Sequence, residues 1–173
     1  MKKIIRTLAA VLFILVSTVG MAQEFTAKKG GNCFTLDLPS YLQQTFDLND
    51  VAILQYSNLV KEAYVIVIED SKAELNSLNM TFESAKEFMQ DFTKDYQLEA
   101  TNRTATDIIE FEANNYKHAQ TEFTWDSEDG SIYMMVTIVE TKGNFYKIMC
   151  WTLLENKDLL RDDYLTISKS LKD

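Results

Sequence analysis

The second half of the chain is dominated by strand-like segments joined by very short polar links. Four segments rich in β-branched and aromatic side chains are strand candidates: 105–112, 116–125, 131–141 and 145–154. The links between them are 114–115 (Asn-Asn), 127–130 (Ser-Glu-Asp-Gly) and 142–144 (Lys-Gly-Asn). Asn, Asp and Gly adopt positive φ at little cost, and links this short make hairpins. The sequence therefore predicts four antiparallel strands.

The first half adds strands and a helix, and a second helix ends the chain. Strand patterns cover 33–38, 51–57 and 63–69. Over 81–97, apolar residues recur at helical spacing behind Thr81, a natural N-cap. A second stripe begins after Asn156 or Asp158 and runs to Leu171. We therefore predict an α+β fold, with an antiparallel sheet of about six or seven strands and amphipathic helices packed on it.

The N-terminus has the three-part layout of a secretory signal peptide. Lys2, Lys3 and Arg6 form a basic start, an apolar run covers 8–19, and small residues precede a cleavage site after Ala22. A retained membrane anchor is the alternative, but the run has roughly a dozen residues where a spanning helix needs about 20. We expect removal of the signal peptide, residues 1–22, which leaves no integral membrane segment. The mature chain is then periplasmic or secreted.

The expected mature chain is strongly acidic. Cleavage removes three of the 17 Lys and Arg residues and none of the 26 Asp and Glu residues, so the formal net charge changes from −9 to −12. This charge repels nucleic-acid phosphates and anionic membrane surfaces, and no Lys/Arg cluster offsets it. Residues 23–173 have the length of a single domain and contain no internal repeat or linker-like stretch. We expect one domain that binds no nucleic acid.

Cys33 and Cys150 are the two cysteines of the chain. In an oxidising compartment an even pair favours a disulfide. Closing a loop of about 117 residues would stabilise the fold by up to about 4.8 kcal/mol if the effect is purely one of chain entropy. Two buried free thiols on neighbouring strands are the alternative, because bridging requires the two Cα atoms to lie close together. Both alternatives stay open from the sequence.

Three segments carry a family resemblance. They are 34–41 (Phe-Thr-Leu-Asp-Leu-Pro-Ser-Tyr), 145–151 (Phe-Tyr-Lys-Ile-Met-Cys-Trp) and 167–172 (Ile-Ser-Lys-Ser-Leu-Lys). They resemble the opening strand and turn, the penultimate strand and the final helix of the PsbP-like fold. The photosystem extrinsic protein, the Ran-binding Mog-type factors and exported bacterial DcrB-like proteins share this fold. The resemblance implies a PsbP-like domain in an exported bacterial protein with a non-catalytic, partner-binding role, and it transfers no functional residue.

His118 is the chain's only histidine. On a strand over 116–125 it shares a face with Gln120, Glu122 and Thr124. One interpretation is a general base oriented by Glu122. We favour a surface histidine on a polar strand face, because no recognisable nucleophile motif accompanies it. One histidine and two distant cysteines also do not supply the three or four N or S ligands of a zinc site.

Two acidic clusters have ordinary structural explanations. Segment 126–130 could offer oxygens to Ca²⁺, but the twelfth position from Asp126 is Thr137, where an EF-hand requires Glu. A solvated hairpin turn is the simpler interpretation. Asp162 and Asp163 lie early in the last predicted helix, where acids interact favourably with the helix dipole. We therefore expect no metal, no cofactor and no catalytic residue.

Two classes of function remain. The first is an exported accessory protein that holds a protein partner on a sheet face, at an edge strand or near Tyr41 and Phe46. The second is a carrier of a lipid or small hydrophobic ligand, with a pocket between helix and sheet. The residues expected to line that pocket are Phe88, Phe92, Met149 and Trp151. An enzyme would need a constellation that the sequence lacks, so we favour the first class.

Overall fold

The computed structural model describes residues 23–31 and 34–173. The expected signal peptide, residues 1–22, and Cys33 lie outside the described residues. The strands are β1 (Phe25–Gly30), β2 (Phe34–Pro39), β3 (Gln43–Gln44), β4 (Leu54–Asn58), β5 (Ala63–Ser71), β6 (Thr101–Ala105), β7 (Ile109–Ala113), β8 (Tyr116–Ser127), β9 (Gly130–Glu140) and β10 (Asn144–Leu153). The helices are α2 (Lys72–Ser77), α3 (Ala85–Asp95) and α4 (Lys157–Ser168), with a short 3-10 turn, η1 (Leu154–Asn156), before the last.

Eight strands form one antiparallel sheet. Its order is β3-β4-β5-β10-β9-β8-β6, and β7 pairs with the same strand, β8, as β6 does. The predicted hairpins are present, with Ser127 paired to Gly130 across the β8–β9 turn and Asn114 and Asn115 at positive φ before β8. This confirms the predicted fold class. The sheet has eight strands rather than six or seven, while β1 and β2 form a separate hairpin.

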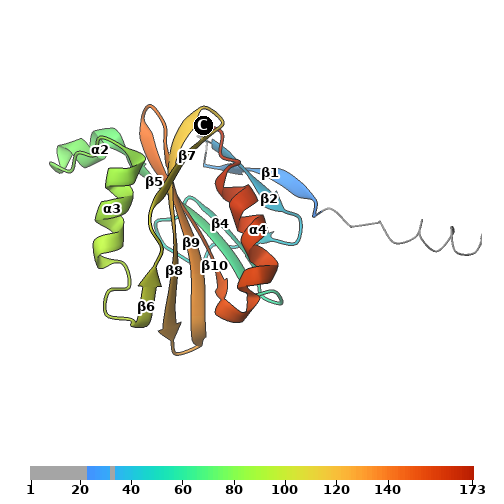
Figure 1. Cartoon of the computed structure of the whole chain (residues 1–173). Helices are drawn as coiled ribbons and strands as arrows, with labels where there is room; N and C mark the ends of the chain where they lie inside the picture. The colour runs from blue at the N-terminus through green and yellow to red at the C-terminus, as the bar shows by residue number, and fades with distance from the viewer. Residues whose placement is uncertain (1–22, 32–33) are drawn as a thin grey trace, which may run out of the picture.

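One face of the sheet is covered by α4 and the β1–β2 hairpin (Figure 1). Apolar side chains from β2, the central strands and α4 meet there, among them Leu36, Ile148 and Leu160, all at most 1% exposed. The Tyr164 hydroxyl donates a hydrogen bond to the Trp151 carbonyl (2.7 Å), which ties α4 to β10. We call this side of the sheet the α4 face.

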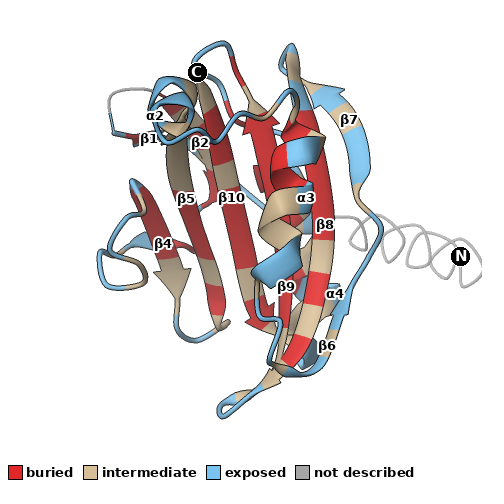
Figure 2. Ribbon diagram, turned by 90° about the vertical axis from the view of Figure 1, so that its left-hand side faces the viewer, coloured by how far each residue is buried: buried red, intermediate tan, exposed pale blue. Residues whose placement is uncertain are grey.

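The opposite side, which we call the α3 face, carries a second core. α3 buries Ala85, Phe88 and Met89 against β8, β9 and β10, and Figure 2 shows the buried central strands behind it. The prediction that this helix starts after Thr81 is wrong. Ser84 is the N-cap, because its Oγ accepts from the Glu87 backbone N–H (3.2 Å).

Several elements depart from the sequence prediction. β1, β3 and α2 lie outside the predicted segments. Segment 105–112, predicted as one strand, contains only the last residue of β6 and the first four residues of β7; the rest of β6 lies outside the predicted segments. β6 and β7 pair one after the other along the edge of β8. The break lies near Thr106, whose N–H donates to the Glu122 carbonyl (2.9 Å) and whose carbonyl accepts from the Thr121 hydroxyl (2.8 Å). These bonds hold the chain on β8 while it changes register.

Candidate functional site

His118 lies inside the protein, with 1% of its surface exposed, so the prediction of a surface histidine is wrong. Its ring stacks on Phe111 of β7 with centroids 4.8 Å apart. The same face of β8 continues with Gln120, which donates to Thr137 and to Ser168 of α4. The polar face of this strand is therefore covered by β7 and α4, two elements that lie before and after it in the chain.

The hydrogen bonds of His118 do not build a catalytic pair with Glu122. A carbonyl can only accept, so His118 Nδ1 carries the proton and donates to the Tyr116 carbonyl (3.0 Å). The carboxylate of Glu122 instead accepts from Arg161 and Tyr133. The two residues share a face as predicted, but each makes its hydrogen bonds to other groups of the protein.

We expect the imidazole of His118 to stay neutral to a lower pH than a free histidine. Burial lowers its pKa below the ordinary value of 6.5, and the hydrogen bond to Tyr116 opposes this only in part. The unfolded chain then binds the proton more readily, so His118 contributes stability above about pH 6.5 that is lost as the pH falls below it. An NMR pH titration of this single histidine measures the effect directly. A folded-state pKa at or above 6.5 would contradict it.

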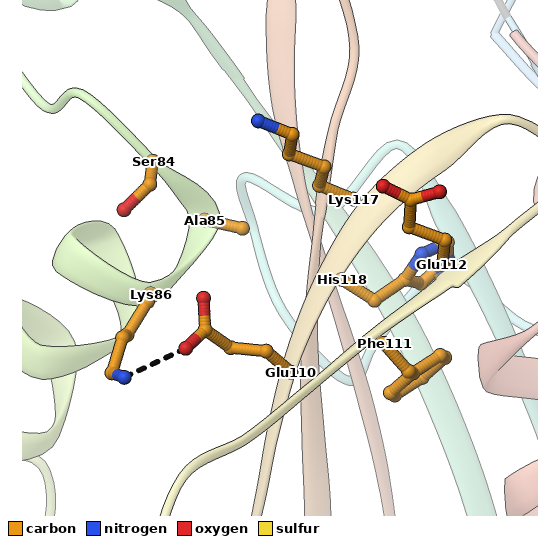
Figure 3. Close-up of a pocket in the computed structure, with 8 residues that line it drawn as sticks. All are labelled: Ser84, Ala85, Lys86, Glu110, Phe111, Glu112, Lys117 and His118. Atoms are coloured by element: carbon orange, nitrogen blue, oxygen red, sulfur yellow. Dashed lines mark hydrogen bonds and ion pairs between the residues drawn. The ribbon is translucent and has the colours of Figure 1, made fainter.

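A mixed-charge pocket of about 340 Å³ lies beside His118, between the start of α3 and the edge strand β7 (Figure 3). Glu110, Glu112 and Lys117 project to one side of the β7–β8 pair, whereas Phe111 and His118 belong to the other side by strand alternation. Figure 3 shows the Lys86 amine joined to Glu110, an ion pair of 2.6 Å. The positive and negative side chains that line this pocket therefore partly neutralise one another.

Acidic residues of both clusters considered in the sequence analysis make hydrogen bonds within the protein. Asp126 accepts from Asn102 (2.6 Å) and from Ser131 (2.7 Å). Asp163 of α4 accepts from the Tyr41 hydroxyl (2.8 Å). Asp162 offers its backbone carbonyl to Thr166 in a bond within the helix. Over 23–31 and 34–173, no group of three or more His, Cys, Asp or Glu side chains is arranged to hold a metal ion.

The two cysteines remain an open question. Cys150 is 1% exposed in the core of the α4 face, where β10 pairs it with Val65 on one side and Met135 on the other. Cys33 lies outside the described residues. The disulfide between Cys33 and Cys150 therefore stays a prediction.

The four residues expected to line a carrier pocket belong to the core of the α3 face or pack against it. The Phe88 ring stacks on Phe145 with centroids 4.9 Å apart, and this aromatic contact fills the interface between α3 and the sheet. Met149 is 6% exposed within the same core, and Phe92 packs against that core. Trp151 stacks instead on Tyr64 of β5, with centroids 5.3 Å apart and planes 14° from parallel.

This aromatic pair belongs to a second pocket, of about 430 Å³, which we call the Trp151 pocket. Its lining residues are Glu62, Tyr64, Asp129, Ile132, Trp151, Thr152 and Leu153. The pocket lies where β5 begins and β10 ends, on a stretch of the α3 face over which Figure 2 shows no helix. Tyr64 and Trp151 are each partly exposed. Two large aromatic rings therefore reach solvent side by side.

The surroundings of the Trp151 pocket are apolar and acidic. Leu59 and Val60, in the turn just before Glu62, are 77% and 96% exposed, and Leu154 is 39% exposed after the end of β10. Burial raises the pKa of Tyr64, and the negative charges of Glu62 and Asp129 raise it further. The two carboxylates therefore act electrostatically on the aromatic pair. Sequence reasoning missed this site because its parts come from three separate regions of the chain.

Comparisons with known proteins identify the fold. No protein-family model and no curated protein sequence matches the chain. The solution structure of cyanobacterial PsbP (CyanoP) from Synechocystis sp. PCC 6803 is similar with a TM-score of 0.61 and 11% sequence identity, covering 90% of this chain and 95% of that one. The crystal structure of PA94, a protein of unknown function from Pseudomonas aeruginosa, has a TM-score of 0.53 and 8% identity, covering 87% and 97%. The chain has a PsbP-like fold, as its sequence predicted.

Proposed function

We propose that the chain is an exported, non-catalytic accessory protein of the cell envelope that binds a protein partner at the Trp151 pocket. Export rests on the signal-like residues 1–22, and a PsbP-like fold is compatible with an accessory role. Among the described residues, none of the helices is both long and apolar enough to cross a membrane. The proposed place of action is the periplasm or the exterior of the cell.

The observation that carries this proposal is the uncovered aromatic pair. Tyr64 and Trp151 are the kinds of side chain that are enriched in protein interfaces, because they bury a large area with few rotatable bonds. Exposed apolar residues at the same end of the sheet (Leu59, Val60 and Leu154) can extend the contact beyond the pocket. The lining combines these rings with the carboxylates of Glu62 and Asp129, so a partner protein can make both apolar and charged contacts there.

Photo-crosslinking from defined surface positions tests the proposal in the organism's own envelope. A benzophenone side chain placed at Val60, beside the pocket, should give a discrete crosslink to one partner protein. The control carries the same group at Leu78, another exposed apolar position (68%) at the end of α2. Crosslinks of equal yield and pattern from both positions would contradict a partner site at the Trp151 pocket, as would the absence of any crosslink from Val60.

A further inference from the structure

The protein uses one arrangement of three side chains repeatedly. A lysine ammonium lies over an aromatic ring and also pairs with a carboxylate. The sets are Lys72 with Phe145 (4.6 Å) and Glu140 (2.8 Å), Lys147 with Phe92 (5.1 Å) and Asp70 (3.5 Å), and Lys157 with Tyr133 (4.8 Å) and Glu122 (3.5 Å). The ring's negative face and the carboxylate both attract the cation, so the two contacts reinforce each other.

The Trp151 pocket contains the ring and the carboxylates of this arrangement, but the described residues bring no cation to it. Trp is the aromatic side chain that binds cations best, and Trp151 lines the pocket together with Glu62 and Asp129. The lysines that flank the site in the sequence contact aromatic rings on the opposite side of the sheet, the α4 face. Lys61 lies over the ring of Tyr41 (5.0 Å), and Lys157 lies over Tyr133.

The backbone at Glu62 gives an independent indication. Glu62 has a φ of 50°, in the left-handed region that Gly and Asn adopt readily and Glu does not. Of the other five described non-glycine residues with positive φ, four are asparagines (Asn79, Asn102, Asn114 and Asn115) and one is Gln97. A glutamate held in this conformation at the edge of a pocket is consistent with a use for its carboxylate, because strained residues concentrate at functional sites.

We propose that the Trp151 pocket receives a lysine or arginine side chain from a basic segment of the partner protein. The cation lies against the stacked pair of Tyr64 and Trp151 and pairs with Glu62 and Asp129. This inference rests on the proposed partner-binding function and states the chemistry of the partner. The acidic charge of the whole chain, −9 over its full length, favours the approach of such a segment.

Peptide binding to the purified protein, followed by NMR, tests the inference. The probe is a short glycine–lysine peptide with blocked ends, and its comparison peptide carries Nε-acetyl-lysine, which has the same stem without the charge. The lysine peptide should shift the indole N–H signal of Trp151 and leave that of Trp125, which is 8% exposed, in place. We expect the acetylated peptide to bind at least about fivefold more weakly, as the loss of a cation–π contact and an ion pair predicts.

Two variants test whether the carboxylates of Glu62 and Asp129 pair with the cation. Glu62→Asn and Asp129→Asn should each weaken lysine-peptide binding by about two- to fivefold. Asn tolerates a positive φ, so Glu62→Asn should fold as stably as the original protein, which urea unfolding checks. Glu74→Gln on α2 is the control and should leave binding unchanged. Equal binding of both peptides, or unchanged binding by both variants, would overturn the inference.

The crosslinking experiment separates this inference from the function on which it rests. If Val60 captures a partner and the double variant Glu62→Asn/Asp129→Asn reduces that capture, both proposals are supported. If the partner is captured equally by the double variant, partner binding at the pocket stands and the cationic occupant is rejected. If Val60 captures no partner, the proposed function fails, whatever the peptides show.

Discussion

Replacing Phe145 by alanine should lower the free energy of unfolding by about 3–5 kcal/mol, as deletions of buried aromatic side chains commonly do. Phe145 is 1% exposed at the start of β10. Its ring stacks on Phe88 (4.9 Å between centroids) and meets Phe82 edge-on at 6.3 Å, so it joins α3 and the segment before it to the sheet. The Lys72 ammonium lies 4.6 Å from the same ring and loses that contact as well.

Urea unfolding followed by circular dichroism measures this effect, and Phe46→Ala is the matched control. Phe46 undergoes the same chemical change in the loop before β4, but it is 79% exposed, so the free energy of unfolding should change by no more than about 0.5 kcal/mol. If Phe145→Ala proves too unstable to purify, Phe145→Leu retains most of the apolar volume and should show a smaller loss in the same direction. A loss below about 1 kcal/mol for Phe145→Ala would show that this ring is not a central part of the core.

The fold was predictable to the extent that local chemistry determines it. The Asn and Gly turns at 114–115, 127–130 and 142–144 each favour a hairpin by their own φ preferences, so the strands they join follow directly. The stripe over 81–97 likewise predicts a helix. The helix starts a few residues later than the sequence predicts, because both Thr81 and Ser84 are good caps and only the packed structure selects Ser84.

The burial of His118 could not be derived from its own strand. Alternation along β8 places His118, Gln120 and Glu122 on one face, and the structure agrees. Alternation does not state whether that face meets water or protein. The cover comes from Phe111 of β7 and from Ser168 of α4, which lies 50 residues further along the chain. A polar face covered in this way looks the same in sequence as one in water.

The Trp151 pocket could not be predicted from the sequence for a related reason. Its parts are Glu62 and Tyr64, Asp129, and Trp151, which meet because β5 pairs with β10 and β10 pairs with β9. The turns predict the second pairing. The first joins strands separated by more than 70 residues, and no local signal in the sequence specifies it. The sequence therefore predicts Trp151 in one pocket with Phe88 and Met149, whereas the sheet places it beside Tyr64.

Removing the carboxylate of Glu122 should destabilise the protein by about 2–3 kcal/mol, because a partly buried acceptor serves several donors at once. Arg161 of α4 donates to it from Nε (3.1 Å) and Nη2 (2.6 Å), and the Tyr133 hydroxyl donates at 3.0 Å. Tyr133 is fully buried, so Glu122→Ala leaves its hydroxyl without an acceptor. Arg161→Ala should cost less, about 1 kcal/mol, since the arginine is 41% exposed and the other donors keep their partner.

Acid should remove this contribution, which distinguishes a charged acceptor from simple packing. Burial raises the pKa of Glu122, but the hydrogen bonds from Arg161 and Tyr133 and the nearby positive charges outweigh it and hold the pKa below its usual value. The unfolded chain then takes up the proton more readily, so the stabilisation is complete above the unfolded pKa of about 4.3 and is lost as the pH falls below it. The isosteric variant Glu122→Gln has no such dependence. Its deficit relative to the original protein should therefore be largest near pH 7 and shrink by pH 3 in urea unfolding, and a deficit that stays constant over this range would mean that the charge of Glu122 does not hold α4 on the sheet.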